Sequence, residues 1–155
     1  MSGSPGAAPT DSERRTFYVA EPPVQYLARP PVVVDCSALA GILFEEPWQA
    51  LAAEKINGCA LNAPFLLQVE ITSVAAKKHK QGLETLAVSG LVRYDALDIA
   101  LHRIQPTHVL ALALRYKLSA YDAAYLWLAA ELKAPLATFD EKLAAAAQTH
   151  LASLP

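Results

Sequence analysis

Short apolar runs alternate with helical stripes of apolar residues along most of the chain, beginning at residue 32. The first run, residues 32–34, consists of three valines. A short β-branched run of this kind is typical of a strand buried on both faces, and this one ends at Asp35. Comparable runs predict three more strands, at residues 59–61, 99–104 and 136–139.

Between these runs, apolar residues recur three and four positions apart, which indicates amphipathic helices. Residues 120–132 give the clearest helix, because Ser119 can cap its start and one apolar stripe runs along it. That stripe consists of Tyr121, Ala124, Tyr125, Leu128 and Leu132. The full set of predicted helices covers residues 37–43, 48–56, 64–80, 83–97, 106–116, 120–132 and 140–148.

Strands that alternate with helices predict an α/β fold with three layers, α/β/α, around a central, mainly parallel, twisted sheet. Two details add to this prediction. A weak break is expected at Ser89 and Gly90 within the helix of residues 83–97, because glycine lowers helix stability. Residues 151–154 are predicted to add an edge strand to the sheet.

The first 31 residues differ from the rest, since they hold six of the eleven prolines and show no helical periodicity. Each proline removes a backbone donor and restricts the residue before it to extended conformations. We therefore predict two parts. Residues 1–31 form an extended or flexible extension, and residues 32–155 form one domain of a size that buries a real core.

Composition narrows the class of protein further. No stretch approaches the roughly 20 apolar residues that span a bilayer, and the N-terminus lacks a basic region followed by an apolar one. We expect a cytoplasmic protein without a membrane partner. The two cysteines, Cys36 and Cys59, fit no disulfide framework or zinc-ligand spacing and are interpreted as reduced core residues.

The formal charge of -2 at first argues against a nucleic-acid partner, because phosphate binding usually shows as surplus Lys and Arg. Residues 32–155 carry ten basic and twelve acidic side chains. If four of those acids surround a metal ion, the remaining charges of this part are positive on balance. Net charge therefore does not exclude RNA as a partner.

Two acids follow predicted strands directly: Asp35 and Asp140. In an open parallel sheet such positions meet at the carboxyl edge, where sites form. Asp122 in the first turn of one helix and Glu70 within another can face the same edge. Taken singly, each acid also has an ordinary reading as a helix cap, a turn former or a solvated charge.

Four carboxylates held close together would raise one another's pKa unless a cation were present. Oxygen ligands without His or Cys suit Mg²⁺ or Mn²⁺, which lower the pKa of bound water and orient a phosphate. The corresponding reaction is phosphodiester hydrolysis. His102, His108 and His150 are scattered along the chain, so we do not expect imidazole ligands.

Four segments around these acids occur in the order found in the PIN-domain family, and they resemble its VapC toxins most. The resemblance covers residues 32 to about 150. The segments are Val-Val-Asp35-Cys-Ser37-Ala-Leu, Leu-Gln-Val-Glu70-Ile, Tyr-Asp122-Ala-Ala-Tyr-Leu and Ala-Thr138-Phe-Asp140-Glu-Lys-Leu. The departures are Cys36 where a small residue is common, Ser119 where Thr is frequent, and the long N-terminal segment.

The resemblance implies a PIN-like fold and a Mg²⁺- or Mn²⁺-dependent endoribonuclease, the toxin of a type II toxin-antitoxin pair. It implies one or two metal ions, an RNA substrate, a cognate antitoxin and a homodimer. It also implies a role for six residues in the site. The catalytic and metal-binding residues are Asp35, Glu70, Asp122 and Asp140, and the supporting polar residues are Ser37 and Thr138.

Lys77 lies seven residues after Glu70 and returns to nearly the same helix face, so it is a candidate contact for an RNA phosphate. The plainer reading is that Lys77 and its basic neighbours complement the negative end of their helix. In the extension, Arg14, Arg15, Phe17 and Tyr18 resemble an antitoxin tail that crosses the groove. A passive leader is the alternative.

Two other classes of function compete with the nuclease. A phosphatase of the haloacid-dehalogenase type needs a second Asp two residues after Asp35, where this chain has Ser37, and no glycine-rich nucleotide motif follows residue 34. The stronger rival is a non-catalytic PIN-like domain that binds RNA or serves as a scaffold. Retention of all four acids favours the enzyme.

Overall fold

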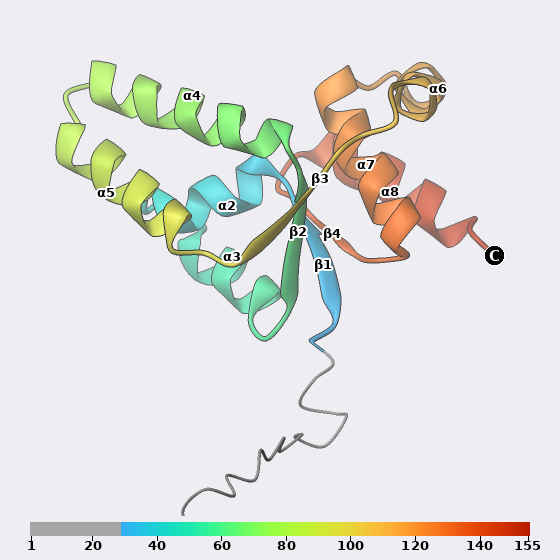
Figure 1. Ribbon diagram of the computed structural model, residues 1–155, viewed down its shortest axis with the longest axis horizontal. Helices are drawn as coiled ribbons and strands as arrows, with labels where there is room; N and C mark the ends of the chain where they lie inside the picture. Colours follow the sequence, from blue (N-terminus) through green and yellow to red (C-terminus); the bar gives the residue numbers. More distant parts are fainter. Residues whose placement is uncertain (1–28) are drawn as a thin grey trace, which may run out of the picture.

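Four parallel strands form the centre of the protein (Figure 1), in the computed structural model that describes residues 29–155. The order across the sheet is β3-β2-β1-β4, and Val33 of β1 lies beside Asn62 of β2 and Leu136 of β4. The predicted parallel sheet is thus confirmed. The strands are β1 (Pro31–Val34), β2 (Ala60–Pro64), β3 (Ile99–His102) and β4 (Leu136–Ala137).

Helices cover both faces of the sheet, which confirms the predicted three layers (Figure 1). The helices between β1 and β3 lie on one side, and those after β3 lie on the other. The first group is α2 (Cys36–Leu43), α3 (Gln49–Ile56), α4 (Leu66–Lys80) and α5 (Glu84–Asp95). The second is α6 (Pro106–Tyr116), α7 (Ala120–Leu132) and α8 (Glu141–Ala152).

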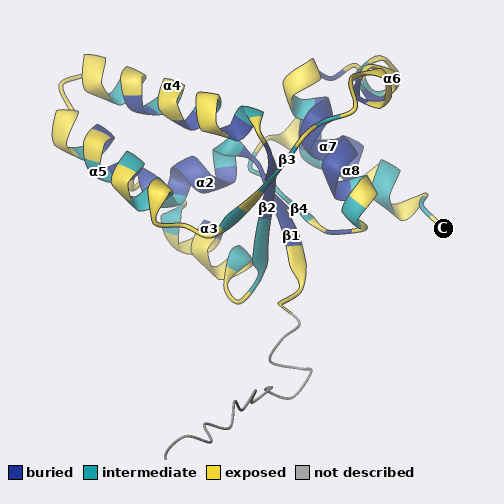
Figure 2. Cartoon of the chain, viewed as in Figure 1, coloured by how far each residue is buried: buried dark blue, intermediate teal, exposed yellow. Residues whose placement is uncertain are grey.

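The core lies where α7 crosses the sheet, and Figure 2 shows this region as the most deeply buried part of the molecule. Residues 123–129 are buried on every side of α7. On the sheet, Val33 and Val34 are fully buried, because a parallel strand is covered on both faces. The buried centre of the sheet therefore ends at Asp35, which directly follows β1.

The C-terminal edge strand predicted at residues 151–154 is wrong, since α8 continues to Ala152. Leu143, Ala146 and Ala147 face the core, and Leu151 continues that stripe one turn further. Helical periodicity therefore overrides the short apolar run at the end of the chain. Tyr121 is a second error: it is 63% exposed, because the first turn of α7 extends beyond the core.

The break predicted at Ser89 and Gly90 is also wrong, since α5 runs through both residues. Gly90 serves packing instead. A Cβ atom at Gly90 would lie 2.3 Å from Cε1 of Phe44, so the missing side chain lets the α2 end approach α5 closely. A glycine that looks like a helix breaker in the sequence is a contact point in the fold.

Other expectations have mixed outcomes. Cys36 and Cys59 are free and half-buried, and Cys36 packs against the edge of the core. Among residues 29–155, no helix has the length and apolar character needed to cross a bilayer. The hypothesis that Arg14, Arg15, Phe17 and Tyr18 cover a groove concerns residues outside the described part of the chain.

Candidate metal centre

Asp35 lies at the carboxyl end of β1 and begins α2. Its backbone N–H donates to the carbonyl of Ala137 in β4 at 3.2 Å, which anchors it to the sheet. Its Oδ1 accepts from the backbone N–H of Ala38 at 2.9 Å and thereby caps α2. The residue is only 5% exposed, so this carboxylate is fixed in a protein environment rather than in solvent.

Ser37 and Thr138 both hold the Asp35 carboxylate. Ser37 Oγ donates to Asp35 Oδ1 at 2.7 Å, and Thr138 Oγ1 donates to Asp35 Oδ2 at 2.5 Å. The two hydroxyls come from segments about a hundred residues apart in sequence, one on α2 and one just after β4. Both carboxylate oxygens of Asp35 are therefore oriented by side chains from neighbouring strand ends.

The backbone of Asp140 is linked to Asp35 through the hydroxyl group of Thr138. The backbone N–H of Asp140 donates to Thr138 Oγ1 at 2.9 Å, the same oxygen that donates to Asp35. Oδ1 of Asp140 accepts from the N–H of Leu143 at 2.7 Å and caps α8. Asp140 is exposed, and it follows β4 at the carboxyl edge of the sheet. It therefore serves as a helix cap at the same edge as Asp35.

Glu70 reaches the same region from α4. It is half-buried, and its Oε2 accepts a hydrogen bond of 2.5 Å from the hydroxyl of Tyr125 on α7. This bond joins the two helical layers across the end of the sheet. From the sequence, Tyr125 is predicted only as part of the apolar stripe, and its bond to Glu70 is not predicted. The available signal was the buried hydroxyl itself, because a buried tyrosine usually finds a hydrogen-bond partner.

Asp122 occupies the first turn of α7, as predicted. Ser119 caps that helix by accepting from the N–H of Asp122 at 3.1 Å, which confirms the predicted N-cap. Asp122 is half-buried, and its charge acts on both Asp35 and Glu70. Three of the four predicted acids, from β1, α4 and α7, thus lie within electrostatic range of one another.

Burial is the largest electrostatic effect on this cluster, and like charge adds to it. Burial raises the pKa of Asp35 above its ordinary value, and the charge of Asp122 adds to the effect against the hydrogen bonds from Thr138, Ala38 and Ser37. The pKa of Glu70 is raised in the same way, by burial and by the charges of Asp35 and Asp122. These carboxylates are therefore stabilised by neutralisation, whether by a proton or by a cation.

Cys36 and Tyr125 border the same carboxylates. Burial, then the charges of Glu70 and Asp35, raise the pKa of the Cys36 thiol to about 12. Burial and the bond to Glu70 raise the pKa of Tyr125. Both groups therefore stay protonated near neutral pH. Cys36 is not an activated nucleophile, and the Tyr125 hydroxyl is a stable donor to Glu70.

The donor set fits a hard divalent cation in its chemistry, because it consists of carboxylate and hydroxyl oxygens. Within residues 29–155, no three His, Cys, Asp or Glu side chains stand close enough together to hold one ion as they are placed. The arrangement that favours a cation here is geometric: Ser37 and Thr138 hold the buried Asp35 carboxylate, and Glu70 and Asp122 lie within electrostatic range of it. Carboxylates with this mutual repulsion gain from a shared positive charge.

Lys77 is exposed near the end of α4. Seven residues of helix place it about 10 Å along the axis from Glu70, towards the end of α4 that lies away from the sheet, so it is not part of the acidic cluster (Figure 1). Its neighbour Lys78 forms an ion pair with Glu46 and so supports the fold. Of the histidines, His102 bonds Asn62 at 2.8 Å and His150 bonds Tyr116 at 3.1 Å.

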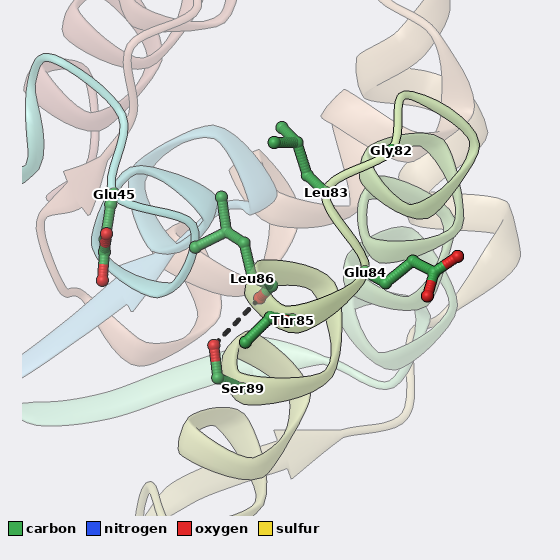
Figure 3. Close-up of a pocket in the computed structure, with 7 residues that line it drawn as sticks. All are labelled: Glu45, Gly82, Leu83, Glu84, Thr85, Leu86 and Ser89. Atoms are coloured by element: carbon green, nitrogen blue, oxygen red, sulfur yellow. Dashed lines mark hydrogen bonds between the residues drawn. The ribbon is translucent and has the colours of Figure 1, made fainter.

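A separate open hollow of about 510 Å³ lies between the end of α2 and the start of α5 (Figure 3). Its acids, Glu45 and Glu84, point away from each other and pair with Arg93 at 3.3 Å and His79 at 3.8 Å. None of the predicted site residues lines it. The residues around it are Glu45, Gly82, Leu83, Glu84, Thr85, Leu86 and Ser89.

These observations define the class of protein: an α/β protein with a parallel sheet and acidic side chains at the carboxyl edge of that sheet. The sequence matches the family model of the PIN domain over residues 32–148, which is most of the chain. The chain belongs to the PIN domain family. Members of this family are commonly nucleases, and they typically bind divalent metals.

A solved structure supports the same fold. The chain is similar to the crystal structure of PAE2754 from Pyrobaculum aerophilum, with a TM-score of 0.61 and 20% sequence identity. The match covers 79% of this chain and 88% of that chain. The PIN-like fold expected from the sequence is therefore confirmed. A search among curated proteins found no significant match.

Proposed function

We propose that the protein is a metal-dependent endoribonuclease that hydrolyses RNA phosphodiester bonds at the carboxyl edge of its sheet. The observation that carries this proposal is the buried Asp35 carboxylate, which is oriented by two hydroxyl groups and lies within electrostatic range of Glu70 and Asp122. Membership of the PIN domain family supports the reaction class.

Asp35, Glu70, Asp122 and Asp140 would hold Mg²⁺ or Mn²⁺. When bound, such an ion supplies a water of lowered pKa and offsets negative charge on the phosphoryl oxygens. Ser37 and Thr138 keep the Asp35 carboxylate in one orientation, and Tyr125 does the same for Glu70. Lys77 would attract the RNA backbone from the exposed side of α4.

The decisive variant for this function is Asp122→Asn, because it removes one charge without changing the shape of the side chain. We expect the full chain to cleave single-stranded RNA with Mg²⁺ or Mn²⁺, and we expect Asp122→Asn or removal of the metal with EDTA to abolish cleavage. The matched control is Asp98→Asn, an exposed acid outside the cluster. Full activity of a folded Asp122→Asn protein would contradict the role of Asp122, whereas a folded wild type that binds RNA but does not cleave it with either metal would favour a non-catalytic RNA-binding or scaffold module.

Lys77→Ala tests the phosphate contact separately. Losing one phosphate contact should weaken RNA binding and reduce its salt dependence by about one counterion, without changing metal affinity. Binding is measured by fluorescence anisotropy of labelled RNA over a range of salt concentrations. Unchanged binding and cleavage would leave Lys77 with its ordinary role at the end of α4.

The biological role that fits this activity is the toxin of a type II toxin-antitoxin pair, held inactive by a cognate antitoxin protein. The support is the resemblance of the four acidic segments to VapC toxins. We expect growth arrest when the chain is expressed in bacteria, rescue by a small protein encoded next to it, and no arrest with Asp122→Asn. Normal growth with active wild-type enzyme would contradict the toxin role.

A homodimer belongs to the same proposal. Leu110 and Leu114 on α6 are 57% and 71% exposed, and an apolar pair of this kind is more typical of a contact surface than of a solvated helix. The mass measured by light scattering after size exclusion should correspond to two chains. A monomeric mass at micromolar concentration would contradict this part of the proposal.

A further inference from the structure

Trp48 lies just before α3 and is fixed from two sides. Its indole rests on α2 at Gly41, where a Cβ atom would lie 2.5 Å from Cδ1 and from Nε1 of the indole. Its ring also contacts Phe139, with ring centroids 5.8 Å apart and planes tilted by 47°. The residue is nevertheless 38% exposed, so these contacts cover it only in part.

This aromatic pair adjoins the acidic cluster. Phe139 directly precedes Asp140, and its backbone N–H donates to Ser37 Oγ at 2.8 Å. The same Ser37 hydroxyl donates to Asp35 Oδ1 at 2.7 Å. Two hydrogen bonds therefore connect the residue under the Trp48 ring to the buried carboxylate. Trp48 is therefore linked to the acidic cluster through Phe139 and Ser37.

The chemistry of an open indole beside a phosphodiester site points to nucleobases. Proteins bind unpaired bases by stacking them on aromatic side chains, and tryptophan offers a large surface for this contact. A base in a duplex is already stacked on both sides and does not offer its face. The contrast within this chain is Trp127, which is 7% exposed and belongs to the core.

We propose that Trp48 is the stacking platform for an unpaired nucleobase of the bound nucleic acid. The inference rests on the proposed nuclease function and deepens it, because it assigns to one side chain the contact with a base of the substrate. Gly41 is needed for this position of Trp48, since any side chain at Gly41 would displace the indole. Phe139 couples the platform to the acids through Ser37.

The test uses the full chain in EDTA, so that binding is measured without cleavage. Trp48 and Trp127 are the two tryptophans, and the buried Trp127 is shielded from the ligand. A single-stranded RNA oligonucleotide should quench the fluorescence of Trp48. The same sequence in a duplex, and a strand made of abasic ribose phosphate, should not. In Trp48→Phe, which keeps a ring but loses the fluorophore, the quenching should vanish.

Affinity provides the second measurement. Trp48→Leu should weaken binding of the single strand by roughly 5- to 150-fold, the range that one stacked base contributes. Trp48→Phe should retain most of the affinity because a phenyl ring still stacks. The matched control is Leu51→Ala, a change at a 47% exposed apolar residue on the adjoining α3, which should leave affinity unchanged.

Equal quenching by duplex and single strand would overturn the platform, and so would equal affinity of Trp48→Phe, Trp48→Leu and wild type. Trp48→Phe also guards against a folding defect, because a ring remains against Gly41 and Phe139. Failure of the nuclease function gives a different pattern: base-dependent quenching persists in EDTA, while no cleavage follows when metal is added.

Discussion

Asp35 shows how one residue serves the fold and the site together. As the last position before α2 it caps the helix, and as a buried carboxylate it takes both of its orienting hydroxyls from Ser37 and Thr138. Its raised pKa is the cost of this placement. A stable fold keeps such a group because neighbouring hydrogen bonds offset part of the desolvation.

At the same scale, Tyr125 is predicted to position Glu70. Tyr125→Phe removes the 2.5 Å hydrogen bond and leaves the ring in the core. Because groups that orient a metal ligand typically contribute about 10- to 100-fold to metal affinity, we expect a loss of roughly tenfold in Mn²⁺ affinity. Titration followed by electron paramagnetic resonance measures it, and cleavage should recover at saturating metal.

Tyr121→Phe is the matched control for this prediction, because Tyr121 lies on the same helix and is 63% exposed. It should bind Mn²⁺ as the wild type does. If Tyr125→Phe also binds Mn²⁺ with unchanged affinity, the hydroxyl has only a structural role and the positioning argument is wrong.

At the scale of elements, Gly90 decides how closely α5 packs on the end of α2. Helix propensity alone favours Gly90→Ala by about 1 kcal/mol. Here the new Cβ would meet the buried Phe44 ring at 2.3 Å and the Leu43 carbonyl oxygen at 3.1 Å. Since overpacking of this kind costs about 1–3 kcal/mol, we expect a net loss of stability in urea unfolding.

Ser89→Ala, the neighbouring change in the same helix, should alter the free energy of unfolding by about 0.5 kcal/mol or less. A Gly90→Ala protein more stable than wild type would show that the two helices separate easily. The close approach of α5 to α2 would then carry little of the fold's stability.

The contact between α6 and α8 predicts a pH dependence of stability. Burial and the charge of Arg115 lower the pKa of His150, whose Nδ1 lies 3.1 Å from the Tyr116 hydroxyl. The folded state thus binds a proton less readily than the unfolded state. The contribution of His150 to the free energy of unfolding is present above its unfolded pKa of about 6.5. It is lost as pH falls through the lower folded pKa.

His150→Gln should therefore show a smaller fall of Tm than wild type between neutral and mildly acidic pH. Thermal unfolding followed by circular dichroism at several pH values measures the difference, and changes from other titrating groups cancel in the comparison. An identical dependence of Tm on pH in the two proteins would show that His150 does not contribute to the pH dependence of stability.

At the scale of the whole molecule, local pattern was enough to predict the sheet and its helices. Valine runs and helical stripes are repeated within each element, and Asp35, Asp140 and Ser119 occupy positions that end or begin an element. Their placement therefore follows from the elements themselves. The family match over residues 32–148 agrees with that outline.

The contacts that sequence could not predict join distant segments. The bond between Tyr125 and Glu70 spans 55 positions, and the approach of Gly90 to Phe44 joins two helices. Such pairs are set by how helices pack, and periodicity within one helix does not encode them. Tyr121 illustrates the same point, because its stripe position was right for the helix but lay beyond the core.

The central claim is that the acids at the sheet edge share a divalent cation, and Mn²⁺ binding to the full chain tests it most directly. Asp35→Asn is the variant of choice, since Asn caps α2 as well as Asp does while the charge is lost. We predict saturable Mn²⁺ binding that Asp35→Asn abolishes and Asp98→Asn retains. Mn²⁺ binding of unchanged affinity in a folded Asp35→Asn protein would contradict the claim.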